Sequence, residues 1–228
     1  MSTQTLIFLV YLAFALVFIL GELGFHKFGL RPESTRKLVH LGIGLITLSF
    51  PFLFDDHLPV LAICAPFLLM DVLAKEFNFL KSLHSIVRKS YGTLAYPVIV
   101  YPLFWGYDFV GTLCCDTPQY ALYFVPILIM AFSDPMAAIV GKRYPIYKLQ
   151  LFETEKSLGG FLAFYISALI ICIVCFALFI DTMTFGQMFF VGSMIGIFTG
   201  LAEVFTRRGW DNFAIPAVAF VMVYFMLY

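Results

Sequence analysis

The chain has 228 residues, of which 62% are hydrophobic and only 12% are charged, and its formal net charge at pH 7 is zero. A soluble globular domain has roughly half apolar and a quarter charged residues. The composition therefore excludes an ordinary soluble protein and indicates a single integral-membrane domain over residues 1–228. Zero net charge gives no sign of a nucleic-acid partner, and the five cysteines show no disulfide or metal-binding framework.

Apolar segments of about 20 residues are needed to cross a bilayer, and the chain contains eight candidates. They lie at 5–21, 38–54, 58–73, 92–107, 120–140, 159–180, 186–204 and 213–228. The first has neither a preceding positive charge nor a following cleavage site, which favours an uncleaved helix over a signal peptide. We therefore expect an all-α, polytopic membrane helical bundle with about eight transmembrane helices.

The basic residues alternate between the predicted connections. All 14 Lys and Arg residues fall in connections 22–37, 74–91, 141–158 and 205–212, and the opposite connections contain acidic but no basic residues. Because Lys and Arg are retained on the cytoplasmic side of a membrane, both termini are expected to be extracytoplasmic. The pattern of 74–91 also predicts an amphipathic helix lying on the cytoplasmic leaflet.

The first polar cluster is Arg36-Lys37-x-x-His40, where the second span enters the membrane. Arg36 and His40 are four positions apart and share a helical face. Basic side chains at this depth commonly serve as membrane anchors. A histidine one turn into an apolar span is not a usual anchor, so we favour a functional role.

The second cluster begins at Asp134, which precedes Pro135 in the fifth span. These residue types suit a cap and a first helical turn, so the sequence predicts a broken span with a new helix starting at Pro135. Four residues fall on one face of that helix: Asp134, Ala137, Ala138 and Gly141. A face of small residues accepts either a neighbouring helix or a flat ligand. A carboxylate at a helix start can also hold Mg²⁺ beside phosphate oxygens.

Basic residues and a glycine turn follow. Lys142 and Arg143 end the segment, and Lys156-Ser157-Leu158-Gly159-Gly160 opens the sixth span. Exposed amides at a helix start attract anions, and a lysine adds a point charge. The spacing is not that of a Walker P-loop and we expect no strand before it. A capped helix start with a snorkelling lysine explains this motif nearly as well as an anion site.

The last cluster contains Glu203, Asp211 and Asn212. Asp211 or Asn212 can serve simply as a helix cap, yet three oxygen donors on one side of the membrane suit a hard cation. Together the clusters place carboxylates, an amide, lysines and a glycine turn at one leaflet. That combination is typical of Mg²⁺-assisted chemistry on a phosphate-bearing substrate.

The order of these motifs resembles the polyprenol kinase family, which covers dolichol, phytol and farnesol kinases and the CTP-dependent diacylglycerol kinase. The resemblance runs from Arg36 to Pro216. Its elements are Arg-Lys-x-x-His, Asp-x-x-Ala-Ala-x-x-Gly-Lys, Lys-Ser-x-x-Gly and Glu…Gly-x-Asp-Asn…Pro. It implies a membrane enzyme that moves the terminal phosphate of CTP onto a lipid alcohol. Two positions depart from the family pattern: Ser133 stands where glycine is common, and Gly159 where glutamate is common.

The resemblance implies three groups of site residues. The expected catalytic residues are Asp134, Asp211, His40 and Lys156. The expected ligands of Mg²⁺ are Asp134, Asp211 and Asn212, with Glu203 in support. The expected CTP-binding residues are Arg36, Lys37, Ala138, Gly141, Lys142, Arg143, Ser157, Gly159 and Gly160.

Two other functions are weighed against a lipid kinase. A phosphatidate cytidylyltransferase also uses CTP, but its typical His-Gly-Gly-x-x-Asp-Arg ending is replaced here by Gly209-Trp210-Asp211-Asn212. A small transporter or lipid translocator would need facing acids near the bilayer midplane, whereas Asp134 and Glu203 belong to clusters at one leaflet. We expect a cytoplasmic site in a prokaryotic inner membrane, or in the endoplasmic reticulum of a eukaryote. The partners would be a nucleotide, a lipid alcohol and membrane lipids; the sequence leaves open which alcohol, CTP or ATP, and the oligomeric state.

Overall fold

The computed structural model describes residues 1–30, 32–77, 92–114, 119–151, 154–206 and 209–227. The helices in these ranges are α1 (Thr3–Phe28), α2 (Pro32–Thr47), α3 (Phe50–Leu53), α4 (Leu58–Glu76), α6 (Gly92–Cys114), α7 (Tyr120–Leu128), η1 (Ile129–Ser133), α8 (Asp134–Arg143), α9 (Leu158–Phe179), α10 (Phe185–Phe205) and α11 (Asp211–Leu227). Each apolar segment found in the sequence is helical, so the helical bundle is confirmed. The amphipathic helix predicted over 74–91 lies mainly outside the described residues.

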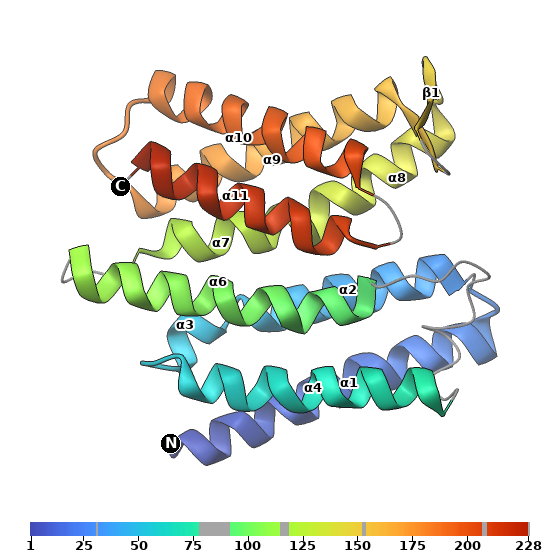
Figure 1. The fold of residues 1–228 in the computed structure, drawn as a ribbon, viewed down its shortest axis with the longest axis vertical. Helices are drawn as coiled ribbons and strands as arrows, with labels where there is room; N and C mark the ends of the chain where they lie inside the picture. The colour runs from blue at the N-terminus through green and yellow to red at the C-terminus, as the bar shows by residue number, and fades with distance from the viewer. Residues whose placement is uncertain (31, 78–91, 115–118, 152–153, 207–208, 228) are drawn as a thin grey trace.

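The helices pack as a layered bundle (Figure 1). α1 contacts α2, α6 lies between α4 and α11, and α9 packs against both α8 and α10. By length and composition, four helical segments of the described chain can cross a membrane: 3–28, 120–143, 158–179 and 185–205. Three further apolar helical segments within the described ranges, at 37–53, 58–70 and 211–227, are shorter. The count of eight spans therefore stays a prediction.

Both chain termini lie at one end of the bundle (Figure 1). The opposite end carries a two-stranded hairpin together with the start of α2, the end of α10 and the start of α11. These parts belong to or border the connections in which the sequence places its basic residues. The shared end of the termini agrees with an even number of crossings, and the membrane side that each end faces stays a prediction.

The hairpin corrects one expectation. β1 (Lys148–Leu151) pairs antiparallel with β2 (Thr154–Ser157), with Lys148 opposite Ser157. A strand therefore does precede the glycine turn, contrary to the prediction. The strands have four residues each, too few to give a clear alternating pattern, and their pairing depends on contacts across the turn rather than on local sequence.

A second correction concerns the fifth predicted span. Residues 120–143 form a continuous helical segment in which η1, a π-helical turn, joins α7 to α8. Ser133 and Asp134 both have right-handed helical backbone angles, and Ser133 makes no side-chain capping bond. Pro135 has no N–H to donate, and its ring displaces the carbonyl four residues earlier. A wider turn accommodates this without ending the helix.

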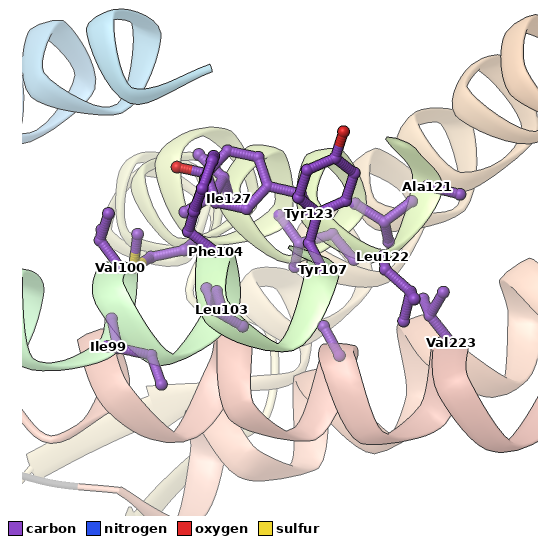
Figure 2. Close-up of a cluster of buried hydrophobic side chains, with 14 of the residues drawn as sticks. Ile99, Val100, Leu103, Phe104, Tyr107, Ala121, Leu122, Tyr123, Ile127 and Val223 are labelled. Carbon is purple, nitrogen blue, oxygen red and sulfur yellow. The ribbon is translucent and has the colours of Figure 1, made fainter. Parts of the chain in front are cut away.

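A cluster of buried aliphatic and aromatic side chains lies between α6, α7 and α11 (Figure 2). Phe104 and Tyr107 of α6 pack against Tyr123 of α7, whose side chain is fully buried. The Tyr123 hydroxyl donates a hydrogen bond of 3.1 Å to the carbonyl of Thr47. This bond satisfies the buried hydroxyl and fixes the end of α2 against α7.

Candidate active site

One cavity brings together five residues that the sequence assigned to the site. Lys37 and His40 come from α2, Asp134 from α8, and Asp211 and Asn212 from the start of α11. These positions are spread over most of the chain, and only the packing of α2, α8 and α11 makes them neighbours of one space. The rest of the cavity wall is mainly apolar and comes from further residues of α2 and α8 and from α1, α3, α4 and α6.

His40 is held by an aromatic contact. Its ring meets the ring of Tyr96 from α6 edge to face, with 4.6 Å between the ring centroids. Tyr96 is buried and also lines the cavity. Lys37, one turn earlier on α2, lines the same cavity. The side chain of Arg36 lies outside the described residues, so its predicted nucleotide contact stays a prediction.

Asp134 follows the π-helical turn directly and is partly buried. Both Asp134 and Pro135 line the cavity. π-helical turns inside α-helices occur frequently at functional sites. The sequence does contain a signal for the π-helical turn. Pro135 lies inside an apolar span, and that span is long enough to continue beyond the proline. The sequence pattern alone predicts a new helix that starts at this proline.

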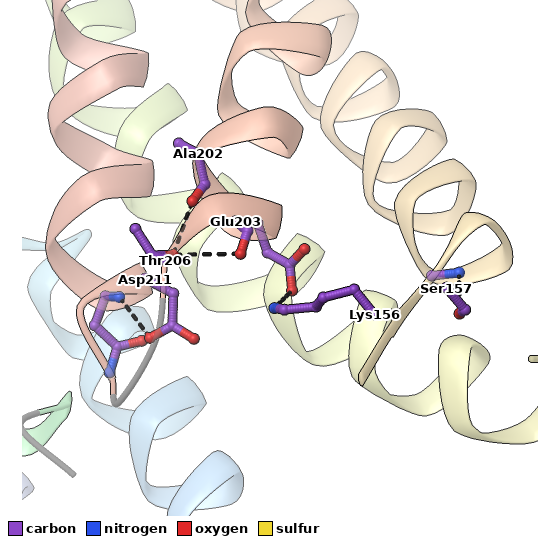
Figure 3. Close-up of polar contacts among 8 residues, drawn as sticks. Lys156, Ser157, Ala202, Glu203, Thr206 and Asp211 are labelled. Atoms are coloured by element: carbon purple, nitrogen blue, oxygen red, sulfur yellow. Dashed lines mark hydrogen bonds and ion pairs between the residues drawn. The ribbon is translucent and has the colours of Figure 1, made fainter. Parts of the chain in front are cut away.

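Asp211 and Asn212 form the first turn of α11. The backbone N–H of Asn212 donates a hydrogen bond of 3.0 Å to Asp211 Oδ1, and Figure 3 shows this contact. Asn212 is 7% exposed. An acid at this position is favourable for the helix dipole, so the structural role of Asp211 and its place on the cavity wall coexist.

Lys156 and Glu203 form an ion pair beside these residues (Figure 3). Lys156 comes from β2 and Glu203 from the last turn of α10. Both side chains are shielded, with 19% and 8% of their surfaces exposed. Asp134 and Asp211 are close enough for their charges to act on Glu203. The carboxylate assigned to supporting a metal is therefore bound to a lysine in this structure.

The start of α9 is capped by a serine, which is one of the two readings that the sequence left open. Ser157 Oγ accepts a hydrogen bond of 3.1 Å from the N–H of Gly160. A Cβ added to Gly160 would lie 3.0 Å from the carbonyl oxygen of Ala137 and 3.3 Å from the Cα of Gly141. The small-residue face of α8 is thus occupied by a neighbouring helix, which is one of the two occupants left open by the sequence. Glycine is needed here for close packing, and a nucleotide contact stays a prediction.

The basic end of α8 is exposed to solvent. Lys142 and Arg143 lie in its last turn, and the guanidinium of Arg143 lies 5.8 Å from the ring centroid of Tyr144. Ala138 is half-buried on the same helix. Neither basic residue lines the cavity, although both lie on the segment that follows Asp134.

Two acids and one amide on the cavity wall are oxygen donors of the kind that Mg²⁺ prefers. Within the described ranges, no three His, Cys, Asp or Glu side chains lie close enough together to hold a metal ion. The cavity does bring together the carboxylates of Asp134 and Asp211 and the amide of Asn212. Mg²⁺ is usually bound through one or two carboxylates, with waters and substrate phosphates completing its shell. A full protein cage is therefore not required.

Comparison with known proteins decides the family. No family model and no solved structure matches the chain. The chain is similar to a phytol kinase of Synechocystis sp., with 32% identity over 198 residues that cover 84% of this chain and 78% of the relative. The chain belongs to the polyprenol and phytol kinase family. The family resemblance predicted from the motif order is confirmed, and the protein is thereby placed in a family of membrane kinases of lipid alcohols.

Proposed function

We propose that this polyprenol and phytol kinase homologue transfers the terminal phosphate of CTP to the hydroxyl of a polyprenol, phytol or diacylglycerol-type lipid at the cytoplasmic leaflet. The observation that carries the proposal is the composition of one cavity wall. Two acids, an amide, a lysine and a histidine meet an otherwise mainly apolar lining. A lipid alcohol has the matching chemistry, with one hydroxyl on a long apolar tail.

Asp134, Asp211 and Asn212 would hold Mg²⁺ together with the nucleotide phosphates. When bound, the ion would neutralise charge on the transferred phosphoryl group. The protein's own contribution is then to place the lipid hydroxyl in line with the terminal phosphate, since phosphoryl transfer depends mainly on positioning and on charge stabilisation. The shared cavity of these three residues supports that assignment.

Lys156 would bind a phosphate oxygen through its ammonium group. Glu203 holds that ammonium group at the end of β2, beside the acids of the cavity. Preorganisation of this kind removes the cost of ordering a flexible lysine when the nucleotide arrives. Lys37 lines the cavity, whereas Lys142 and Arg143 lie outside it on the solvent side, where they would attract the nucleotide.

The lipid hydroxyl would lie between His40 and a carboxylate of the cavity. His40 is fixed by the ring of Tyr96 and lines the same wall as Asp134 and Asp211. A neutral imidazole or a carboxylate can accept the hydroxyl proton as the oxygen attacks the phosphate. Either group restores its proton balance by releasing that proton to water after the phosphorylated lipid leaves.

The proposal is tested with purified protein in lipid nanodiscs. Phytol, geranylgeraniol, a polyprenol and diacylglycerol are each incubated with CTP or ATP in the presence of Mg²⁺. We expect a phosphorylated lipid and CDP, and we expect no product when Mg²⁺ is removed by a chelator. Product with ATP alone would overturn the choice of CTP. Absence of phosphorylated lipid with both nucleotides, in protein shown to be folded, would overturn the kinase function for these lipids.

A further inference from the structure

The cavity extends far beyond its polar residues. Thr47 lies ten residues after Lys37 on α2, and both line the cavity. At about 1.5 Å per residue this separation is about 15 Å along the helix. That is about half the hydrocarbon thickness of a bilayer. Between these two points the wall carries apolar side chains, among them Ile43 and Val100.

Phe50 lies on the cavity wall beyond Thr47. It begins the short helix α3, and its side chain is fully buried. Its ring packs edge to face against Phe54 and Phe104, with centroid separations of 5.7 and 6.5 Å. Neither Phe54 nor Phe104 is part of the cavity wall. The Phe50 ring therefore separates the cavity from the aromatic core behind it.

We propose that Phe50 closes the tail-binding part of the cavity and thereby limits the length of the lipid tail that the protein accepts. The inference rests on the proposed function, because that function places the hydroxyl of the lipid beside Asp134. Packed protein interiors have low compressibility. A tail that reaches Phe50 must bend back or leave the cavity, and it cannot push into the core.

Length selection of this kind depends on steric exclusion. The tail of a membrane lipid already lies in hydrocarbon, so its transfer into an apolar cavity gains little free energy. Extra methylenes forced into a well-packed space are instead unfavourable. We therefore expect the binding affinity to change little with tail length as long as the tail fits. Once a tail is too long, the affinity should fall by about tenfold.

Three variants separate this role from general stability. Phe50→Leu shortens the side chain that closes the cavity, and Val100→Phe adds bulk to the cavity wall nearer its polar end. Phe176→Leu is the matched control, because Phe176 is also fully buried but belongs to α9 and does not line the cavity. Only the first two are expected to change which tails bind.

The experiment measures binding of tritiated saturated primary alcohols of increasing length to purified protein without nucleotide, and then phosphate transfer to the same alcohols. We expect the length limit to move to longer alcohols in Phe50→Leu, to shorter ones in Val100→Phe, and to stay unchanged in Phe176→Leu. If thermal melting shows that Phe50→Leu does not fold, the change of the length limit in Val100→Phe decides whether the inference holds.

Two results would overturn the inference: a wild-type protein with no length limit, or folded cavity variants that keep the wild-type limit. A length limit that shifts as expected without any phosphate transfer would support the tail site and contradict the proposed kinase function. Binding and transfer thus report separately on the two claims.

Discussion

Lys156 and Glu203 form a shielded ion pair that joins the end of β2 to the last turn of α10. Glu203 is close enough to Asp134 and Asp211 to interact with their charges. The pair therefore has a position between the cavity acids and the start of α9. A buried ion pair often adds little net stability, because the cost of removing both charges from water offsets their attraction. Removing only one partner is strongly destabilising, since it leaves an unpaired charge in the protein interior.

The first prediction is that Lys156→Met destabilises the protein by about 3 kcal/mol, because the buried carboxylate of Glu203 loses its cationic partner. The double variant Lys156→Met/Glu203→Gln removes both charges and should recover most of this stability. Activity should fall by about a hundredfold in both, because each lacks the ammonium group that would bind phosphate. Thermal unfolding in detergent and lipid phosphorylation measure the two effects. Recovery of activity in the double variant would show that Lys156 is purely structural.

The second prediction concerns Asp134→Asn. Loss of a favourable charge at a helix start costs only about 0.3–1 kcal/mol, so the variant should fold and melt nearly as wild type. If Asp134 holds Mg²⁺ or orients the hydroxyl, the rate should fall by about a hundredfold or more, at roughly 1.36 kcal/mol per factor of ten. Asp211→Asn should behave in the same way.

Asp56→Asn is the matched control for these two variants. Asp56 accepts a hydrogen bond of 2.8 Å from the N–H of Leu58, in the connection that precedes α4 and away from the cavity wall. Asparagine retains that acceptor, so activity should not change. Full activity in Asp134→Asn would mean that this acid serves only the helix, and our assignment of the metal would be wrong.

The helical organisation could be predicted from the sequence because long apolar segments carry their own signal. Two local features could not. A proline can end a helix or be accommodated within it, and the local sequence around Pro135 does not decide between the two. Packing of α9 against both η1 and α8 keeps this segment helical. The β1–β2 hairpin depends on pairing between residues such as Leu149 and Lys156. The composition of such short strands does not predict this pairing.

The site could be predicted as an inventory of residues but not as an arrangement. Sequence order alone placed Asp134, Glu203 and Asp211 at one leaflet, and the structure brings Asp134 and Asp211 to one cavity. The pairing of Glu203 with Lys156 was not expected, because the two are 47 positions apart and each was explained by itself. Tyr96 was missed entirely. Its position became informative only when its ring was found against His40.

The third prediction tests the close packing at the start of α9. A Cβ at Gly159 would lie 2.5 Å from the carbonyl oxygen of Tyr144, a backbone atom that cannot move aside alone. Gly159→Ala should therefore lower the melting temperature and, by displacing Lys156, also the activity. At Gly186, on the first turn of α10, an added Cβ meets nothing within 4 Å. Gly186→Ala should be neutral in both measurements, and equal effects at the two positions would contradict the packing described here.

The fourth prediction concerns topology. Both termini lie at the end of the bundle opposite the β1–β2 hairpin (Figure 1), and the basic connections are expected in the cytoplasm. Reporter fusions that are active only in the cytoplasm should therefore be silent at both ends of the chain. A reporter inserted after Leu151, between the two strands, should be active. A cytoplasmic signal from either terminus would overturn the eight-span topology and place the site on the other leaflet.

The most direct test follows the phosphorus atoms of the nucleotide. Purified protein is incubated with phytol and CTP labelled at either the α- or the γ-phosphate, and the lipid and nucleotide products are separated. We expect γ-label to enter the lipid, α-label to stay in CDP, and Asp134→Asn to slow the transfer by about a hundredfold or more. Entry of α-label into the lipid with release of pyrophosphate would contradict the kinase function, because that outcome requires a cytidylyltransferase.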